Sequence, residues 1–453
     1  MKKFDYIIIG SGQAGIPLAF SLSKHGTVAL VERGSLGGTC VNNGCIPTKA
    51  YVASARRIWD AFHGEELGIE IPEGTRANLK KIKERKDKLV AESRTNIEEA
   101  LQRDEKITVY KGEAHFLSNY EVKVEQSTLT AQKIFINVGA RAVVPAEYQK
   151  VPYYTNANIM EITDIPKHLI IIGGSYIGLE FAQIFKRFGS EVTIIERNER
   201  LINREDETVT DVVAEILKSE GINLIFNARD IKATKNDQTE IAVTVGDKEI
   251  KGSHLLLAIG RAPNTDSLKL ENTTIQQDDK NYIKVDDYCQ TNVDGIFAIG
   301  DCNGQGAFTH TSYNDFQIVE DFLFKDKTRK ISDRIPTYAL FIDPPLGRIG
   351  ITKKEALEKG YEVLVGYRPM TKVNRAKEKA ETFGFMEAVI DGGTGLFLGA
   401  CVLGVGGDEI INGITNLMYA KKPYTVLRDS VHIHPTVSEL IPTMLGDLKP
   451  ISK

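Results

Sequence analysis

Cysteine is scarce in this sequence, and long apolar runs are missing from it. Only five of the 453 residues are cysteine. That number is too few for a disulfide scaffold, so a close cysteine pair is more often catalytic or metal-binding. No apolar run approaches the roughly 20 residues that span a bilayer. The run at residues 6–9 is too short for a signal peptide and is followed by Gly10 and Gly12. We therefore expect a cytoplasmic protein that does not enter a membrane.

A surplus of charge of one sign is also missing. The formal net charge is −4, which gives no global reason to expect nucleic acid or an anionic membrane as a partner. The most basic stretch, Lys80–Lys83, falls in a helix expected over about 78–102. Because Glu84, Asp87 and Glu92 interleave with the lysines of this helix, we interpret the stretch as a solvated helix face.

Two similar units, about 160 residues apart, organise the chain. Each has a short apolar strand, a glycine-rich turn, a helix and a second strand that ends in glutamate. The strands are expected at 4–9 and 28–31 in the first unit, and at 169–172 and 192–195 in the second. This order is typical of dinucleotide-binding units. At roughly 150 residues per domain, the length predicts about three domains.

The first turn, Gly10, Gly12 and Gly15, fits the spacing G-x-G-x-x-G between a strand and a helix. The first glycine allows the tight turn, the second lets the backbone approach a pyrophosphate, and the third lets the helix pack on the strand. The helix N-terminus offers N–H donors to the phosphates. Glu32 is expected to bind ribose hydroxyls. Together with Gly300-Asp301 further along, the pattern predicts a bound dinucleotide.

The second turn consists of Gly173, Ser175 and Gly178, and Glu196 closes its second strand. Serine replaces the middle glycine and adds a Cβ where the phosphates approach. Glu196 suits the adenosine ribose of NAD, whereas Arg197 suits the 2′-phosphate of NADP. An anionic Glu196 repels that phosphate, so we favour NADH as the electron donor and keep NADPH as the alternative.

Cys40 and Cys45 lie in the segment Gly38–Lys49. A helix that starts near Cys45 and Pro47 places Cys45 at its N-terminus, where the pKa of a thiol is lowered. Zinc needs a second cysteine or histidine pair at ligand spacing, and none is present. A redox-active disulfide is therefore favoured, and no metal site is predicted. The other cysteines are expected to be buried, inert thiols: Cys289, Cys302 and Cys401.

Six ordered motifs resemble those of the class I pyridine nucleotide–disulfide oxidoreductases, the relatives of glutathione reductase, dihydrolipoamide dehydrogenase and mercuric reductase. They are Gly10–Gly15, Gly38–Lys49, Gly173–Glu180, Ala258–Arg261, Ala298–Asp301 and His434–Glu439. The resemblance covers the whole chain. It implies an α/β protein with two Rossmann-like dinucleotide-binding domains and a C-terminal α+β dimerisation domain. The implied divisions are 1–148 (FAD-binding), 149–266 (NAD(P)-binding), 267–332 (a central part returning to the FAD domain) and 333–453 (dimerisation).

The resemblance also implies roles around the flavin. Cys40 is the interchange thiol, and Cys45 is the cysteine nearer the flavin. Lys49 lies near the flavin and pairs with Glu180, while Tyr176 covers the flavin until nicotinamide arrives. The other cofactor contacts that it implies are Asp301 (on the ribityl and phosphate part of FAD), Gly38, Thr39, Gly139, Gly260 and Arg261.

His434 and Glu439 match a terminal pair that completes the active site of the other subunit in a homodimer. His434 is expected to move a proton to or from Cys40, with Glu439 orienting its ring. His310 and His432 match no such position, and we interpret them as structural.

The resemblance implies that electrons pass from NAD(P)H through FAD to Cys40 and Cys45. The final acceptor is expected to be a small oxidant: a disulfide, a metal ion or a reactive chlorine species. The segments Ala307–His310 and Thr337–Gly347 look most like the mercuric-reductase-like and reactive-chlorine-resistance flavoenzymes. The chain lacks the C-terminal vicinal cysteines of true mercuric reductases. Dihydrolipoamide dehydrogenase stays open as an alternative, as does a flavin-bound redox sensor with little turnover.

Overall fold

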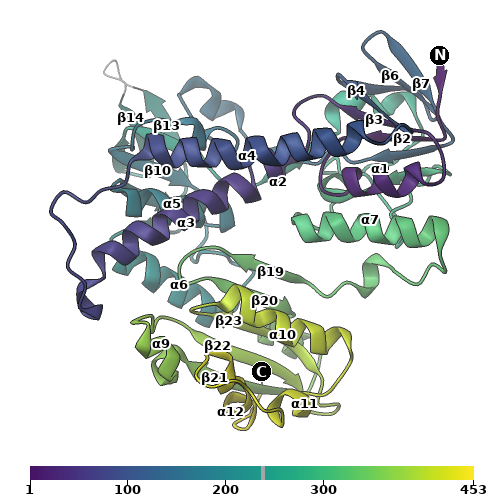
Figure 1. The fold of residues 1–453 in the computed structure, drawn as a ribbon. Helices are drawn as coiled ribbons and strands as arrows, with labels where there is room; N and C mark the ends of the chain where they lie inside the picture. Colours follow the sequence, from purple (N-terminus) through teal and green to yellow (C-terminus); the bar gives the residue numbers. More distant parts are fainter. Residues whose placement is uncertain (236–239, 453) are drawn as a thin grey trace.

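The computed structural model describes residues 1–235 and 240–452. Two parallel sheets and one antiparallel sheet carry most of the strands, and Figure 1 shows them as three separate bodies, with the C-terminal body at the bottom. Long helices run between the first two bodies. The fold is therefore the mixed α/β architecture that the sequence predicts.

The first parallel sheet contains the first predicted unit. Its strands, in spatial order, are β18 (Ile296–Ala298), β8 (Lys133–Ile136), β2 (Tyr6–Ile9), β3 (Val28–Glu32) and β4 (Ile107–Lys111). All of its pairings are parallel. Strand β2 is buried along its whole length, as its unbroken apolar sequence requires. Because β18 pairs with β8, the chain returns to this sheet after about 160 residues.

Helices α1 (Gly15–Ser23) and α7 (Thr309–Phe324) lie side by side against this sheet (Figure 1). A smaller sheet joins β1 (Lys2–Lys3), β7 (Ser127–Thr130), β6 (Glu121–Val124) and β5 (Ala114–Ser118). The two-stranded pair β9 (Ala140–Ala142) and β17 (Arg261–Pro263) links the first body to the second.

The second parallel sheet has the order β12 (Asn223–Ile225), β11 (Glu191–Ile195), β10 (His168–Ile172) and β16 (His254–Leu257). Its helices are α5 (Tyr176–Phe188) and α6 (Glu207–Ser219). An antiparallel sheet of β13 (Lys232–Lys235), β14 (Ile241–Val245) and β15 (Lys248–Gly252) packs beside it. Both predicted dinucleotide units are thus present, with strand ends within one or two residues of those expected.

Three further helices precede the second sheet: α2 (Gly38–Asn42), α3 (Cys45–Phe62) and α4 (Leu79–Gln102). The side chain of Asn78 caps α4 by accepting from the Lys81 N–H. The expectation of a solvated face on α4 is only partly right. Lys86 is buried, and its ammonium lies 2.6 Å from Glu161, because this part of α4 packs against the second body.

The C-terminal sheet is antiparallel, with the order β19 (Thr337–Leu340), β20 (Leu346–Gly350), β23 (Phe397–Leu403), β22 (Phe385–Asp391), β21 (Val363–Pro369) and β24 (Lys449–Ile451). Its helices are α8 (Lys353–Glu358), α9 (Asn374–Glu378), α10 (Gly407–Tyr419), α11 (Thr425–Arg428) and α12 (Ile441–Leu445).

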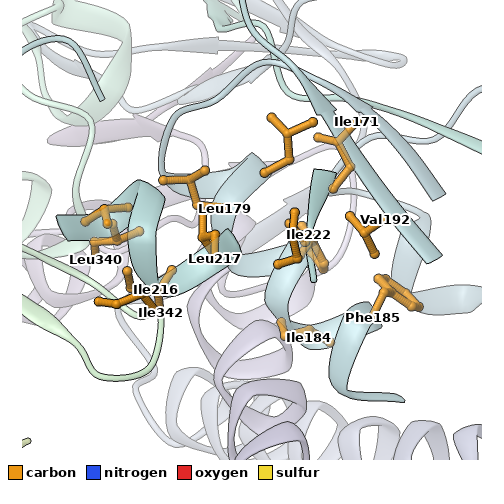
Figure 2. Close-up of a cluster of buried hydrophobic side chains, with 14 of the residues drawn as sticks. Ile171, Leu179, Ile184, Phe185, Val192, Ile216, Leu217, Ile222, Leu340 and Ile342 are labelled. Atoms are coloured by element: carbon orange, nitrogen blue, oxygen red, sulfur yellow. The ribbon is translucent and has the colours of Figure 1, made fainter. Parts of the chain in front are cut away.

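One apolar core joins the second body to the C-terminal sheet. In Figure 2, Leu340 and Ile342 lie beside Ile216 and Leu217 of α6, and all four side chains are buried. A buried ion pair between Arg348 and Glu205 crosses the same boundary. This shared core fixes the C-terminal sheet relative to the cavity described below.

Candidate active site

Cys40 and Cys45 lie on two consecutive helices, a short one and a long one. Cys40 is in α2, and Cys45 is the first residue of α3, as the sequence predicts. Asn43 and Gly44 separate the two helices, and a Cβ at Gly44 would lie 2.7 Å from the Thr39 carbonyl oxygen, so only glycine allows the close approach. Both cysteines are free thiols.

The two thiols ionise unequally. A hydrogen bond from the Cys40 thiol lowers the pKa of Cys45 to about 6, with help from the Thr309 hydroxyl and the charge of Lys49. The same bond, together with burial, raises the pKa of Cys40 well above its ordinary value. In the reduced pair near neutral pH, Cys45 therefore carries the negative charge and Cys40 keeps its proton.

Lys49 lies one helical turn after Cys45 and forms an ion pair with Glu180 of α5. The Lys49 Nζ atom is 2.7 Å from Glu180 Oε2, and the Glu180 side chain is only 8% exposed. The other carboxylate oxygen accepts from the Phe341 N–H at 3.1 Å. The Lys49 ammonium also lies 4.2 Å from the centre of the Phe341 ring. The pair thus joins all three bodies at the cysteines.

The first glycine turn has the geometry that its spacing predicts. Gly10 has φ +105°, and a Cβ at Gly15 would lie 2.3 Å from the Gly10 carbonyl oxygen, so helix α1 packs directly on the turn. Glu32 accepts from the Ser11 N–H at 2.9 Å and from the Ser11 hydroxyl at 2.7 Å. Its second oxygen accepts from the Gly34 N–H.

A cavity of about 970 Å³ connects this turn to the cysteines. The predicted residues that line it are Gly10, Gly12, Glu32, Gly38, Thr39, Cys40, Cys45, Lys49, Gly139, Tyr176, Glu180, Arg261 and Asp301. The structure thus brings together, in one space, residues that are far apart in the sequence.

The donors and acceptors around this cavity fit FAD. Helix α1 begins without a side-chain cap, and at the start of α7 the Thr311 hydroxyl accepts from the Phe308 N–H, so other N–H groups at these two helix starts can meet phosphate or carbonyl oxygens. A Cβ at Gly12 would lie 3.2 Å from the Asn137 amide, so a side chain at this position would crowd the turn. Burial raises the pKa of Asp301, and Arg261 lies 3.4 Å away and opposes that rise.

The second glycine turn repeats the first. Gly173 has φ +109°, Ser175 is the N-cap residue of α5, and a Cβ at Gly178 would lie 2.1 Å from the Gly173 carbonyl oxygen. Glu196 is buried and accepts from the Gly174 N–H at 2.7 Å.

Next to this second turn, Arg197 is exposed, and Gly260 has φ +132° with open space where its Cβ would be.

Tyr176 stands between the second turn and the cavity. Its ring meets Phe308 and Tyr338 edge-on, at centroid distances of 5.9 and 5.3 Å. His310, for which the sequence predicts a structural role, stacks on Phe308 and also lines the cavity. Its Nε2 atom lies 2.7 Å from the Thr337 carbonyl oxygen.

His434 and Glu439 form a pair but do not join the cavity. The His434 Nδ1 atom is 2.8 Å from Glu439 Oε2, and the histidine side chain is 76% exposed. Neither residue is among those that line the cavity. The neighbouring side chains of Val431 and Ile433 are almost fully exposed, at 101% and 80%.

Thr309 also belongs to the site, although no sequence pattern points to it. Its hydroxyl oxygen lies 3.1 Å from the Cys45 sulfur. The residue belongs to the segment Ala307–His310, whose sequence indicates a resemblance to a subgroup but no role in the site. No spacing rule connects positions 264 residues apart.

The prediction of buried, isolated thiols is confirmed for Cys289, Cys302 and Cys401. Burial raises the pKa of both Cys302 and Cys401 to about 12. Over the described residues, no three His, Cys, Asp or Glu side chains are grouped to hold a metal ion. Within the same residues, no helix has the length and apolar content needed to span a membrane.

Comparison with known proteins adds family information. Residues 4–315 match the model described as "Pyridine nucleotide-disulphide oxidoreductase", and residues 336–445 match the dimerisation domain of the same family. The chain is 35% identical to the probable pyridine nucleotide-disulfide oxidoreductase RclA of Escherichia coli, over 99% of this chain and 100% of the relative. It is 33% identical to a mercuric reductase of Lysinibacillus sphaericus, over 90% of this chain and 76% of that protein.

A solved structure is also similar. The Cu(II) complex of the HOCl-induced flavoprotein disulfide reductase RclA from Escherichia coli superimposes with a TM-score of 0.91 and 34% identity, over 98% of this chain and 99% of that one.

Proposed function

This chain belongs to the pyridine nucleotide-disulphide oxidoreductase family, and from that premise we propose that Cys40 and Cys45 are its redox-active pair. The chain is an FAD-dependent enzyme that uses NAD(P)H, as the family does. When bound, FAD supplies the two-electron chemistry that connects the nicotinamide to the cysteines.

The placement of the two thiols carries the proposal. Cys40 and Cys45 line one cavity, and Cys45 lies one helical turn from the Lys49–Glu180 ion pair. The pKa of Cys45 is lowered and that of Cys40 is raised, which favours a thiolate on Cys45 and a thiol on Cys40. Cys40 must lose its proton before it can attack an oxidant. Oxidation of this thiolate–thiol pair to a disulfide releases two electrons and the one proton that Cys40 holds, so a base near Cys40 is needed.

We propose that His434 of a second subunit is this base and that the chain acts as a homodimer. The His434–Glu439 pair is exposed in a single chain, beside the exposed side chains of Val431 and Ile433. The match to a dimerisation domain over residues 336–445 supports the same arrangement. The boundaries 1–148, 149–266, 267–332 and 333–453 remain our proposed division, with the third segment returning to the first sheet through β18.

We propose NADH as the preferred donor. Glu196 is buried at the end of β11, with its carboxylate held by the Gly174 and Asn198 N–H groups. A fixed negative charge there disfavours a 2′-phosphate, while Arg197 is exposed and free to turn away. We also propose a cytoplasmic location, where thiols are kept reduced.

The acceptor is proposed to be a small oxidant: a metal ion, a disulfide or a reactive chlorine species. Among these, copper(II) is the first to test, because the similar Escherichia coli protein has been solved as a Cu(II) complex and is described as HOCl-induced. Dihydrolipoamide dehydrogenase activity is the main alternative, because a dihydrolipoyl dehydrogenase of Chlamydia pneumoniae is 30% identical over 97% of this chain.

A Cys40→Ser variant tests the proposal. Reduction of bound flavin by NADH should survive, while reduction of copper(II) and of a model disulfide should be lost. Cys289→Ser is the matched control, because Cys289 is a buried thiol that does not line the cavity. Undiminished acceptor reduction in Cys40→Ser would remove Cys40 from the role of interchange thiol. Rapid NAD⁺-dependent oxidation of dihydrolipoamide by the native enzyme would favour the alternative.

A further inference from the structure

Two helices begin at the Cys45 sulfur. Cys45 is the first residue of α3, and Thr309, whose hydroxyl oxygen lies 3.1 Å from the sulfur, is the first residue of α7. A thiolate has no proton to give, so the hydroxyl must be the donor in this contact whenever Cys45 is ionised. The N-terminal ends of both helices add partial positive charge at the same point.

The charged and titratable groups around Cys45 come from three elements. Cys40 of α2 donates to it, Lys49 of α3 attracts its negative charge, and Glu180 of α5 opposes that charge. Lys49 and Glu180 are bound to each other at 2.7 Å, so much of the effect of the lysine is cancelled. The uncharged Thr309 hydroxyl on α7 reaches both sulfurs and lowers the pKa of each, so it can serve Cys45 alone once Cys40 is no longer a thiol.

The donor from Cys40 does not last through the reaction. Once the Cys40 sulfur is bonded to an acceptor sulfur, it has no proton left to donate. In the next step the Cys45 thiolate attacks the Cys40 sulfur, the Cys45–Cys40 bond forms, and the bond from Cys40 to the acceptor breaks with release of the acceptor thiolate. Cys45 must be ionised at that moment, and the Thr309 hydroxyl is still in place.

We propose that Thr309 is a further catalytic residue, whose hydroxyl holds Cys45 as a thiolate when the Cys40 donor is lost. This inference rests on the proposed redox role of the cysteine pair. The proposal gives a role to the segment Ala307–His310, which belongs neither to the two glycine turns nor to the Lys49–Glu180 ion pair.

The test uses flavin-loaded enzyme with Cys40→Ala, which removes the Cys40 donor and prevents disulfide formation. In this background, Thr309→Val removes the hydroxyl and keeps the side-chain shape, while Thr309→Ser keeps the hydroxyl. The ionisation of Cys45 is followed against pH in two ways. One is the long-wavelength absorbance of a thiolate next to oxidised flavin, and the other is the rate of alkylation of Cys45 by iodoacetamide, located by mass spectrometry.

Thr309→Val should raise the midpoint of both titrations by about one pH unit, which is about a tenfold loss of thiolate at a fixed pH below the midpoint. Thr309→Ser should titrate close to the parent. Equal midpoints in all three proteins would overturn the inference while leaving the proposed function standing. Absence of the long-wavelength band at every pH in the parent would instead count against the proposed function. Alkylation still reads the midpoint in a variant that has lost its flavin.

Discussion

Glu180 and Lys49 carry opposite charges beside the same thiol, so removing each one separately should move the ionisation of Cys45 in opposite directions. Glutamine at position 180 keeps the shape of glutamate and an oxygen that can accept from the Phe341 N–H, which is 3.1 Å away in the native protein. Glu180→Gln therefore removes little except one negative charge. Lys49→Met removes the positive charge and keeps most of the apolar stem.

The direction of each effect follows from the causes of the Cys45 pKa, which is about 6 in the native pair. Glu180 raises it and Lys49 lowers it, so Glu180→Gln should lower the pKa and Lys49→Met should raise it. An opposite charge within 4–6 Å shifts a pKa by about 1–3 units. Because the Lys49 side chain is 34% exposed and screened by water, we expect the lower end, about one unit upward, for Lys49→Met. Glu180 is only 8% exposed, so Glu180→Gln should lower the pKa by about one unit or more.

The assay is the pH dependence of the long-wavelength absorbance of the enzyme reduced anaerobically by two electrons. Lys353→Met is the matched control, because Lys353 is bound to buried Glu387 at 2.8 Å in the C-terminal sheet and does not line the cavity. It should cost stability without moving the midpoint. If Glu180→Gln and Lys49→Met shift the midpoint in the same direction, or not at all, the electrostatic account of Cys45 is wrong.

Three further predictions concern other parts of the molecule. Arg348→Met leaves Glu205 buried without its cation and should cost about 3–5 kcal/mol of stability near neutral pH. Burial already holds the pKa of Glu205 above its ordinary value, and losing the cation raises it further. A carboxyl group whose pKa is raised by folding destabilises the folded state as the pH rises and the group ionises. The loss of stability in Arg348→Met, measured by urea denaturation, should therefore be smaller near pH 5 than near neutral pH. Glu205→Gln, which removes the buried charge, should restore stability to the variant. Glu196→Gln should lower the ratio of kcat/KM for NADH over NADPH by about tenfold, and an unchanged ratio would remove Glu196 from cofactor selection. His434→Gln should slow acceptor reduction by about 10²–10⁴-fold in steady-state assays while stopped-flow reduction of the flavin by NADH stays at the native rate.

Local patterns were sufficient for the two dinucleotide units. Each glycine turn is flanked by its own strands and helix within about 30 residues, so the spacing Gly10, Gly12 and Gly15 determines the φ angles and the close helix contact without help from the rest of the chain. The start of α3 at Cys45 was predicted for the same reason. The Lys49–Glu180 pair was expected only from the family resemblance, and the two residues lie 2.7 Å apart.

Contacts between segments far apart in the sequence were beyond local patterns. The approach of Thr309 to Cys45 depends on how α7 packs against the first sheet, which no spacing within either segment encodes. From the sequence, Lys86 is indistinguishable from the surface lysines of α4. In the structure it is buried and paired with Glu161 of the second body. Such contacts depend on tertiary packing, because burial turns a solvated charge into one that needs a partner.

The return of β18 to the first sheet also has a consequence for folding during synthesis. During synthesis, β2, β3, β4 and β8 emerge early, but the edge of β8 has no partner until residues 296–298 have been added. At roughly 5–20 residues per second, the intervening stretch of about 160 residues takes on the order of 10–30 s to make. Over that time the second unit, which lies wholly within the gap, can fold first. Until then the edge of β8 stays exposed, with unpaired backbone groups that can pair with another chain. A chaperone that covers this edge would be most useful at that stage.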